Sequence, residues 1–153
     1  MADATGMTKE QKKAVQASWA LVKPNIRQHG IDFFVLFFTT YPDYKNIFND
    51  FRNLSVNELA GSPKLRGHAS VVMYSLTNMV DALDDPDCLV EIIAKLAEKH
   101  KPRGITVTHY ENVGKVLLTF LEKKLDKRFD SKTKAAWVIL LTTLVSVVKA
   151  TGG

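Results

Sequence analysis

Apolar residues recur every three or four positions along almost the whole sequence, and this spacing constrains the fold more than any other feature. Such spacing is typical of helices that bury one face. The clearest stretch runs from Ser62 to Asp84, where the spaced residues are Leu65, Val72, Leu76, Met79 and Leu83. A sustained period of two is missing, and so is any Asn-Gly or Asp-Gly hairpin signal. The fold class is therefore predicted to be all-α, with about seven helices and short connections.

Prolines and capping residues indicate where these helices begin and end. Thr8–Gln11 and Thr108–Glu111 have the spacing of a capping box, in which a hydroxyl and a polar side chain satisfy free backbone amides. Ser62-Pro63 predicts a helix start, whereas Pro42 pushes the preceding residue away from helical angles and ends a helix. The remaining boundaries are predicted at Pro24, at Asp84–Asp87, at Pro102 and Gly104, and at Asp130 or Ser131.

Length and cysteine content bear on the domain count and the compartment. A chain of 153 residues favours one domain over 1–153, with flexible ends expected at 1–7 and 150–153. The single cysteine, Cys88, cannot form an internal disulfide, and a secretory signal is not seen, so a cytoplasmic location is expected. The longest uncharged stretch, Ala135–Val148, is shorter than the roughly 20 residues of a spanning helix. We expect a core helix there and no membrane partner.

The net charge of +5 is mild for a protein that binds nucleic acid. Basic residues cluster between Lys123 and Lys134, but Glu122, Asp126 and Asp130 interleave with them. Mixed charges of this kind are typical of a solvated helix end and turn. No nucleic-acid partner is therefore expected.

Two of the four histidines, His68 and His100, fall on apolar stripes. A buried imidazole is unfavourable unless it finds a hydrogen bond or a metal. For either histidine alone, a satisfied core or helix-end residue is the simpler interpretation. Together they place one inward imidazole on each of two helices joined by the Asp84–Asp87 turn, which indicates a shared partner.

Several kinds of partner fit the sequence poorly. A structural zinc site needs four Cys or His ligands, and the chain has one Cys and no Cys/His cluster. A catalytic cysteine is not indicated, because Cys88 has no neighbouring base in the sequence. A phosphate-binding loop is not indicated either, because no glycine-rich motif occurs. A large apolar cofactor that carries its own metal, such as haem, needs only one protein imidazole. The aromatic residues agree, because six of the eight phenylalanines lie between Phe33 and Phe51, where they could form the walls for a flat macrocycle.

The order of these features resembles an intracellular animal globin from about Thr8 to Val148. The matching residues are Trp19, Gly30, Tyr41-Pro42 through Phe48, His68 with Val72, and Leu96–His100. The segments Val80–His100 and Arg103–Ile105 are similar to invertebrate globins of the mollusc type.

The resemblance implies a globin fold of about seven to eight helices around a pocket for haem b, iron protoporphyrin IX. His100 would be the proximal iron ligand, with its other ring N–H held by a carbonyl or similar acceptor. His68 would be the distal histidine, which donates a hydrogen bond to bound dioxygen or becomes a sixth ligand. The other pocket residues would be Phe48 and Val72 against the haem, Pro42 at the preceding corner, and Ile105 and Leu96 on the proximal side.

Three positions, in two parts of the pocket, depart from the vertebrate pattern. Phe34 occupies the site facing the ligand where leucine is common in myoglobin-like globins, so we expect a smaller distal cavity and altered ligand kinetics. Asp50 and Val71 stand where a cationic or polar residue often holds the haem propionates. Their role is predicted to pass to a cation elsewhere, namely Lys64, Lys99 or Arg103.

The expected function is reversible binding of dioxygen for storage or transport, with CO and NO as further diatomic ligands, and not enzymatic catalysis. One alternative is a six-coordinate globin in which His68 binds the iron, as in a sensor or electron carrier. Another is a redox enzyme such as a nitric oxide dioxygenase or peroxidase. His68 and His100 would be used in each of these functions, so the sequence does not separate them. The chain could be a monomer or a homodimer.

Overall fold

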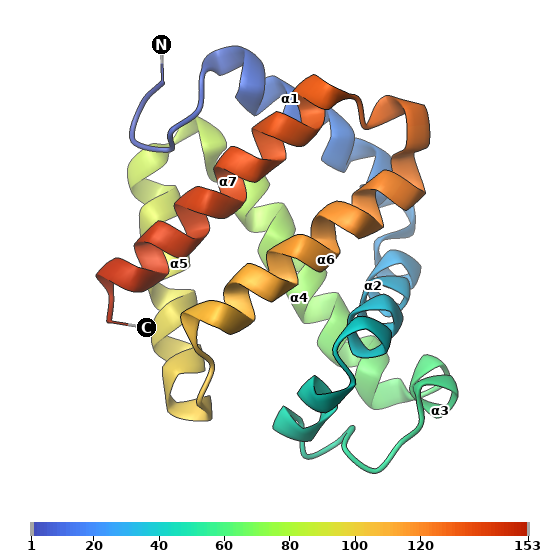
Figure 1. The fold of residues 1–153 in the computed structure, drawn as a ribbon. Coiled ribbons are helices and arrows are strands. Elements are labelled where there is room, and N and C mark those ends of the chain that lie inside the picture. The colour runs from blue at the N-terminus through green and yellow to red at the C-terminus, as the bar shows by residue number, and fades with distance from the viewer. Residues whose placement is uncertain (1, 153) are drawn as a thin grey trace.

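The computed structural model describes residues 2–152, and within them the chain forms seven α-helices and no strand (Figure 1). The helices are α1 Lys9–Val22, α2 Ile26–Thr40, α3 Val56–Ala60, α4 Pro63–Asp81, α5 Pro86–His100, α6 Val107–Leu125 and α7 Ser131–Ala150. Short 3₁₀ turns lie at Lys23–Asn25, Pro42–Ile47, Ala82–Asp84, Lys101–Arg103 and Asp126–Arg128. The prediction of an all-α fold with about seven helices is confirmed.

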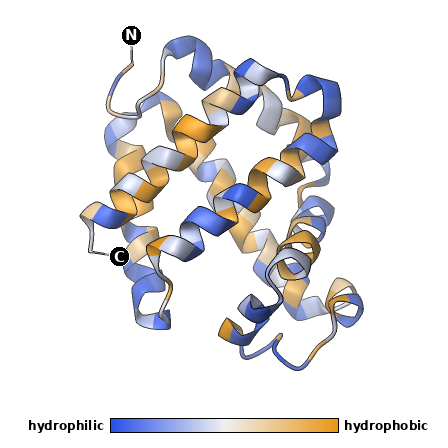
Figure 2. Cartoon of the chain, viewed as in Figure 1, coloured by the Kyte–Doolittle hydropathy of each residue, from blue (hydrophilic) through white to orange (hydrophobic). Residues whose placement is uncertain are grey.

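The long helices cross one another around a common core. In Figure 1, α6 and α7 lie side by side and α4 crosses behind them. Helix α2 packs against α4 and α6, whereas α1 and α5 each pack against α4 and α7. Hydrophobic and hydrophilic residues alternate along each long helix (Figure 2), and the buried residues are mostly hydrophobic. This arrangement places α4, which carries His68, against α5, which ends at His100.

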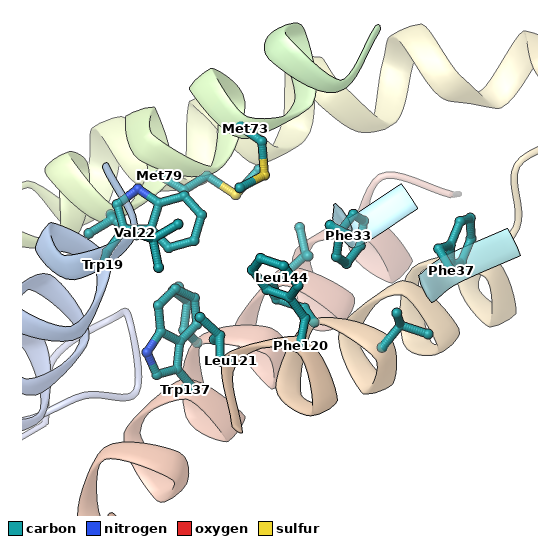
Figure 3. Close-up of a cluster of buried hydrophobic side chains, with 14 of the residues drawn as sticks. Trp19, Val22, Phe33, Phe37, Met73, Met79, Phe120, Leu121, Trp137 and Leu144 are labelled. Atoms are coloured by element: carbon teal, nitrogen blue, oxygen red, sulfur yellow. The ribbon is translucent and has the colours of Figure 1, made fainter. Parts of the chain in front are cut away.

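Trp19 of α1 and Trp137 of α7 pack together in the core, with ring centroids 5.8 Å apart (Figure 3). Both indole N–H groups have acceptors. Trp137 Nε1 donates to Ser18 Oγ at 2.8 Å, and Trp19 Nε1 donates to Thr77 Oγ1 at 2.9 Å. Because a buried indole N–H needs a partner, these bonds fix α1 against both α7 and α4.

Helix α2 approaches α4 closely at Gly30. A Cβ atom added to Gly30 would lie 2.8 Å from Met73 Cγ, so a larger residue would push the two helices apart. The absence of a side chain lets α2 rest directly on α4. Phe34, one turn further along α2, thereby reaches His68 on α4.

The start of α6 differs from the prediction. The capping box expected at Thr108–Glu111 is wrong, because α6 already begins at Val107. Thr106 is the cap, and His109 Nδ1 accepts from its backbone amide at 2.9 Å, the role that Glu or Gln fills in the usual pattern. Helix α3 was not predicted, since five residues are too few to show a period. The other boundaries are confirmed at Thr8–Gln11, Pro42, Pro63, Pro86 and Asp130.

Residues 5–7 pack on the body of the protein, although they belong to the end 1–7 that was expected to be flexible. Met7 is fully buried, and Thr143 Oγ1 donates to the Thr5 carbonyl at 2.6 Å. Gly6, with φ +77°, provides the left-handed turn between them. Residues 1 and 153, which belong to the two expected flexible ends, lie outside the described residues.

Helix α7 is long and apolar enough to cross a membrane by length and composition, with a hydropathy of 1.5. Its buried residues include Trp137, Leu140, Leu144 and Val148, which share one face. This face packs against α1, α5 and α6. Of the apolar stretch of α7, 33% is buried in the fold, so packing in the core accounts for part of its apolar composition.

Candidate functional site

His100 is the last residue of α5, and a hydrogen bond within its own helix orients its ring. Its Nδ1 lies 2.8 Å from the carbonyl oxygen of Leu96, one turn earlier. A carbonyl can only accept, so the neutral ring carries its proton on Nδ1 and has its lone pair on Nε2. The chain then turns away through Lys101–Arg103 and the left-handed Gly104, φ +76°. His100 therefore presents a fixed nitrogen that can coordinate a metal.

His68 lies in α4, half-buried among aromatic rings. The rings of Phe34, Phe48 and Phe51 meet it edge-on, with centroids 5.0, 5.1 and 5.8 Å away. Within residues 2–152 its ring forms no hydrogen bond that would hold it to another group. The imidazole is thus confined by packing alone, and its nitrogens are available to a ligand.

The His68 imidazole favours its neutral form. Burial lowers its pKa below the ordinary value of 6.5, and positive charge at His100 and Arg103 lowers the pKa further. These charges act on His68 because α5, which ends at His100, packs against α4. At neutral pH, His68 therefore carries one N–H donor and one lone pair.

The phenylalanine-rich stretch forms a connected wall on the His68 side of the site. Phe34 is buried and contacts Phe37 and Phe38, with centroids 6.1 and 5.7 Å away. Phe38 in turn packs against Phe48 at 5.6 Å and Phe51 at 6.2 Å. Because the rings support one another, the position of Phe48 is set by several contacts, and the wall is apolar throughout.

Half-buried apolar side chains continue this surface around both histidines. Val72 and Leu76 lie one and two turns beyond His68 on α4, Leu96 lies one turn before His100, and Ile105 follows the turn after it. All four pack against the core but are less buried than its members. An apolar group can therefore bury area against them.

These residues fit a haem better than a bare metal ion. Within the described residues, His, Cys, Asp and Glu form no group of three or more that could hold a metal. A haem iron needs only one protein ligand, which His100 Nε2 can supply, and the porphyrin plane needs apolar walls. The neutral His68, the phenylalanine wall and the half-buried aliphatic residues meet these requirements.

The three cationic residues expected at the haem propionates differ in whether a carboxylate already pairs with them. Lys64 Nζ lies 3.2 Å from Asp50 Oδ1 in an exposed ion pair, so part of its charge is already matched. Lys99 and Arg103 are exposed beside His100, and Arg103 is near enough to lower the pKa of His68. Val71 is 67% exposed and points away from the core.

Two residues of the site were not singled out in the sequence. Phe51 contacts the His68 ring, although the sequence indicated it only as a member of the phenylalanine cluster and not as a site residue. Tyr110 of α6 meets the His100 ring edge-on at 6.1 Å, and burial raises the pKa of its hydroxyl. The sequence showed Tyr110 only as one residue of the supposed capping box at Thr108–Glu111.

Fold and site together define an α-helical haem-binding protein. The sequence model of the globin family matches residues 31–148, and the chain belongs to the globin family. A globin of Nerita albicilla is 33% identical over 144 residues, which cover 94% of this chain and 92% of that protein. Hemoglobin-3 of Phacoides pectinatus is 32% identical over 137 residues, which cover 87% and 86%. The resemblance to globins of the mollusc type is confirmed.

Solved structures show the same fold. Ferric myoglobin of Aplysia limacina superposes with a TM-score of 0.89 at 27% identity, covering 96% of this chain and 99% of that one. A hexacoordinated heme protein from an anhydrobiotic tardigrade has a TM-score of 0.89 at 18% identity, with 98% of each chain covered. The second likeness is one of fold alone. The chain has the globin fold, as expected.

Proposed function

We propose that this protein binds dioxygen reversibly, for storage or transport, at the iron of a haem b held by His100. The observation that carries the proposal is the pair of imidazoles. His100 has its Nδ1 bonded to a carbonyl and its Nε2 available, whereas the nearby His68 is neutral and forms no hydrogen bond among the described residues. CO and NO are the further diatomic ligands expected, and no enzymatic role is proposed.

The haem, when bound, supplies the metal that takes the diatomic ligand. His100 would hold the iron, and the Leu96 carbonyl would keep the imidazole in one tautomer and orientation. His68 would donate its N–H to the polar ligand, a hydrogen bond whose net worth is about 0.5–1.5 kcal/mol. Phe34 and Phe48 would exclude water from the space between the imidazoles.

The edge of the haem would be held by cations near His100. We propose Arg103 and Lys99 as the main partners of the propionates, with Lys64 as a weaker one because it pairs with Asp50. Ile105 and Val72 would contact the porphyrin on its two faces. The exposed thiol of Cys88 is compatible with a reducing, cytoplasmic location, which belongs to the proposal.

A six-coordinate state is the alternative that a specific observation favours. Because no hydrogen bond among the described residues holds the His68 ring, a small movement could bring it to the metal as a sixth ligand. Such a protein would serve as a sensor or in redox reactions, nitric oxide dioxygenase and peroxidase chemistry included. The hexacoordinated tardigrade protein has the same fold.

A visible spectrum of the ferrous, ligand-free protein tests the proposal. A five-coordinate high-spin spectrum that changes reversibly with oxygen supports the oxygen carrier, and a low-spin spectrum supports the six-coordinate alternative. His100→Ala should lose the haem or shift its Soret band, whereas His29→Ala, whose ring lies against the Val22 carbonyl, should retain it. Wild-type protein that takes up no hemin would contradict both forms of the proposal.

A further inference from the structure

Tyr110 carries the one buried side-chain oxygen or nitrogen, within residues 2–152, that has no hydrogen-bond partner. The residue is 8% exposed and lies in the first turn of α6, where it packs against the end of α5. A hydroxyl removed from water without a partner destabilises the protein, so each such group needs an explanation. Phenylalanine would provide the same packing without this penalty.

His100, whose ring contacts the Tyr110 ring, offers the hydroxyl no acceptor. The His100 ring lies edge-on to the Tyr110 ring, with centroids 6.1 Å apart. His100 Nδ1 is protonated, because it donates to the Leu96 carbonyl. Its Nε2 lone pair is the one that would bind iron. A hydrogen bond from Tyr110 to either nitrogen would therefore conflict with the function of His100 as a ligand.

We propose that Tyr110 is a positioning residue for the haem, and that its hydroxyl donates a hydrogen bond to an oxygen acceptor present only when the haem is bound. This inference rests on the proposed function. The acceptor is either a haem carboxylate or a water molecule that the haem encloses, and both are oxygen acceptors in a site that excludes bulk water. Tyr110 then adds to haem retention on the His100 side.

The test compares Tyr110→Phe with the wild type in the haem-free and haem-loaded forms. Without haem, the variant should unfold at the same or a higher urea concentration, because an unpaired hydroxyl has been removed. With haem, it should lose the cofactor about three- to tenfold faster to a haem acceptor. The iron–histidine Raman band should shift as well. Tyr74→Phe, on the exposed face of α4, is the matched control and should change neither form.

The opposite signs in the two forms separate a haem contact from simple packing. Equal destabilisation of both forms, or haem loss within twofold of the wild type, would overturn the inference and leave the proposed function standing. Wild-type protein that takes up no hemin would overturn both. Haem dimethyl ester distinguishes the two acceptors: the difference between wild type and variant should shrink if Tyr110 bonds a carboxylate, because a neutral ester carbonyl is a weaker acceptor, and persist unchanged if it bonds water.

Discussion

Gly30 of α2 lies so close to Ala69 of α4 that a Cβ atom on Gly30 would be 3.1 Å from the Ala69 Cβ and 3.2 Å from the Ala69 carbonyl oxygen. The neighbouring atoms are a backbone oxygen and a short side chain, which cannot rotate away. His68 directly precedes Ala69, and Phe34 follows Gly30 by one turn. The separation of the two helices therefore sets how Phe34 meets His68.

Gly30→Ala should destabilise the protein by about 1–3 kcal/mol, because overpacking forces the helices apart. Urea unfolding monitored by circular dichroism measures this change. Gly67→Ala is the matched control, since a Cβ at Gly67 in α4 meets nothing within 4 Å. There the better helix propensity of alanine should stabilise by about 0.5–1 kcal/mol. Similar changes in the free energy of unfolding at the two glycines would show that Gly30 is not required for the close approach of α2 to α4.

Phe34→Leu should alter ligand kinetics, because it removes the ring that meets His68 edge-on at 5.0 Å. A smaller side chain enlarges the space beside His68 and loosens the imidazole, so association of CO after flash photolysis should become faster. Oxygen dissociation should change as well. Phe129→Leu, at a buried position in the turn between α6 and α7, serves as the control for general loss of packing. Unchanged rate constants for both steps in Phe34→Leu would refute the effect.

His68 should make the haem-free protein less stable in mild acid. Its pKa is lowered in the folded state, first by burial and then by the charges of His100 and Arg103, whereas the unfolded chain keeps a pKa near 6.5. Below pH 6.5 the unfolded state thus binds more protons, and stability falls as the pH drops toward the folded pKa. Above pH 6.5 this contribution should be constant.

The free energy of unfolding is measured for the wild type and for His68→Gln at several pH values between about pH 8 and pH 5. The loss of stability on acidification should be smaller in the variant. His109→Gln, with its histidine at the start of α6, is the control for acid effects elsewhere. The same slope in wild type and His68→Gln would contradict the assignment of this pH dependence to His68.

The bond between Ser18 and Trp137 should contribute measurably to stability. Ser18→Ala leaves the buried Trp137 N–H without its acceptor, 2.8 Å away in the native protein, and should cost about 1–3 kcal/mol. When Trp137→Phe is already present, the same Ser18→Ala change should cost less, because no donor remains to be stranded. A double-mutant cycle gives the coupling, and purely additive effects would show that the hydrogen bond contributes nothing.

The helices and the two histidines could be predicted from the sequence because both depend on local pattern. His68 and His100 each interrupt an apolar stripe with a polar ring, and Pro63 and Pro86 mark the starts of their helices. The order of the motifs then suffices for the family. The start of α6 was misplaced because His109 replaces the usual Glu or Gln of a capping box, a substitution that pattern matching does not recognise.

Ring orientation and pairing were beyond the sequence, since they arise from tertiary packing. The unpaired hydroxyl of Tyr110 depends on how α5 and α6 meet, and the buried Thr5–Met7 segment depends on a contact with Thr143 in α7. Thr5–Met7 and Thr143 are far apart in the sequence, and α5 and α6 are separated by a turn whose geometry cannot be inferred from the spacing of residues. The sequence could not show which cationic residues are already paired with a carboxylate, because Asp50 and Lys64 become neighbours only in the fold.

Arg103 should hold the haem more strongly than Lys64 does. Its charge already reaches His68, whereas Lys64 lies 3.2 Å from Asp50 and is partly matched. Arg103→Ala should therefore speed haem loss at low salt, and the effect should shrink as salt screens the exposed charge. Lys64→Ala should have a smaller effect, and Lys127→Ala, in the turn after α6, none.

The same variant has a second readout in the haem-free protein. Removal of the Arg103 charge should raise the pKa of His68 toward its ordinary value, which an NMR titration of the imidazole protons can follow. Burial, the larger cause, remains, so part of the lowering should persist. Haem loss from Arg103→Ala at the wild-type rate, together with an unchanged His68 pKa, would place Arg103 outside the site and leave Lys99, with the weaker Lys64, as the candidates for the propionates.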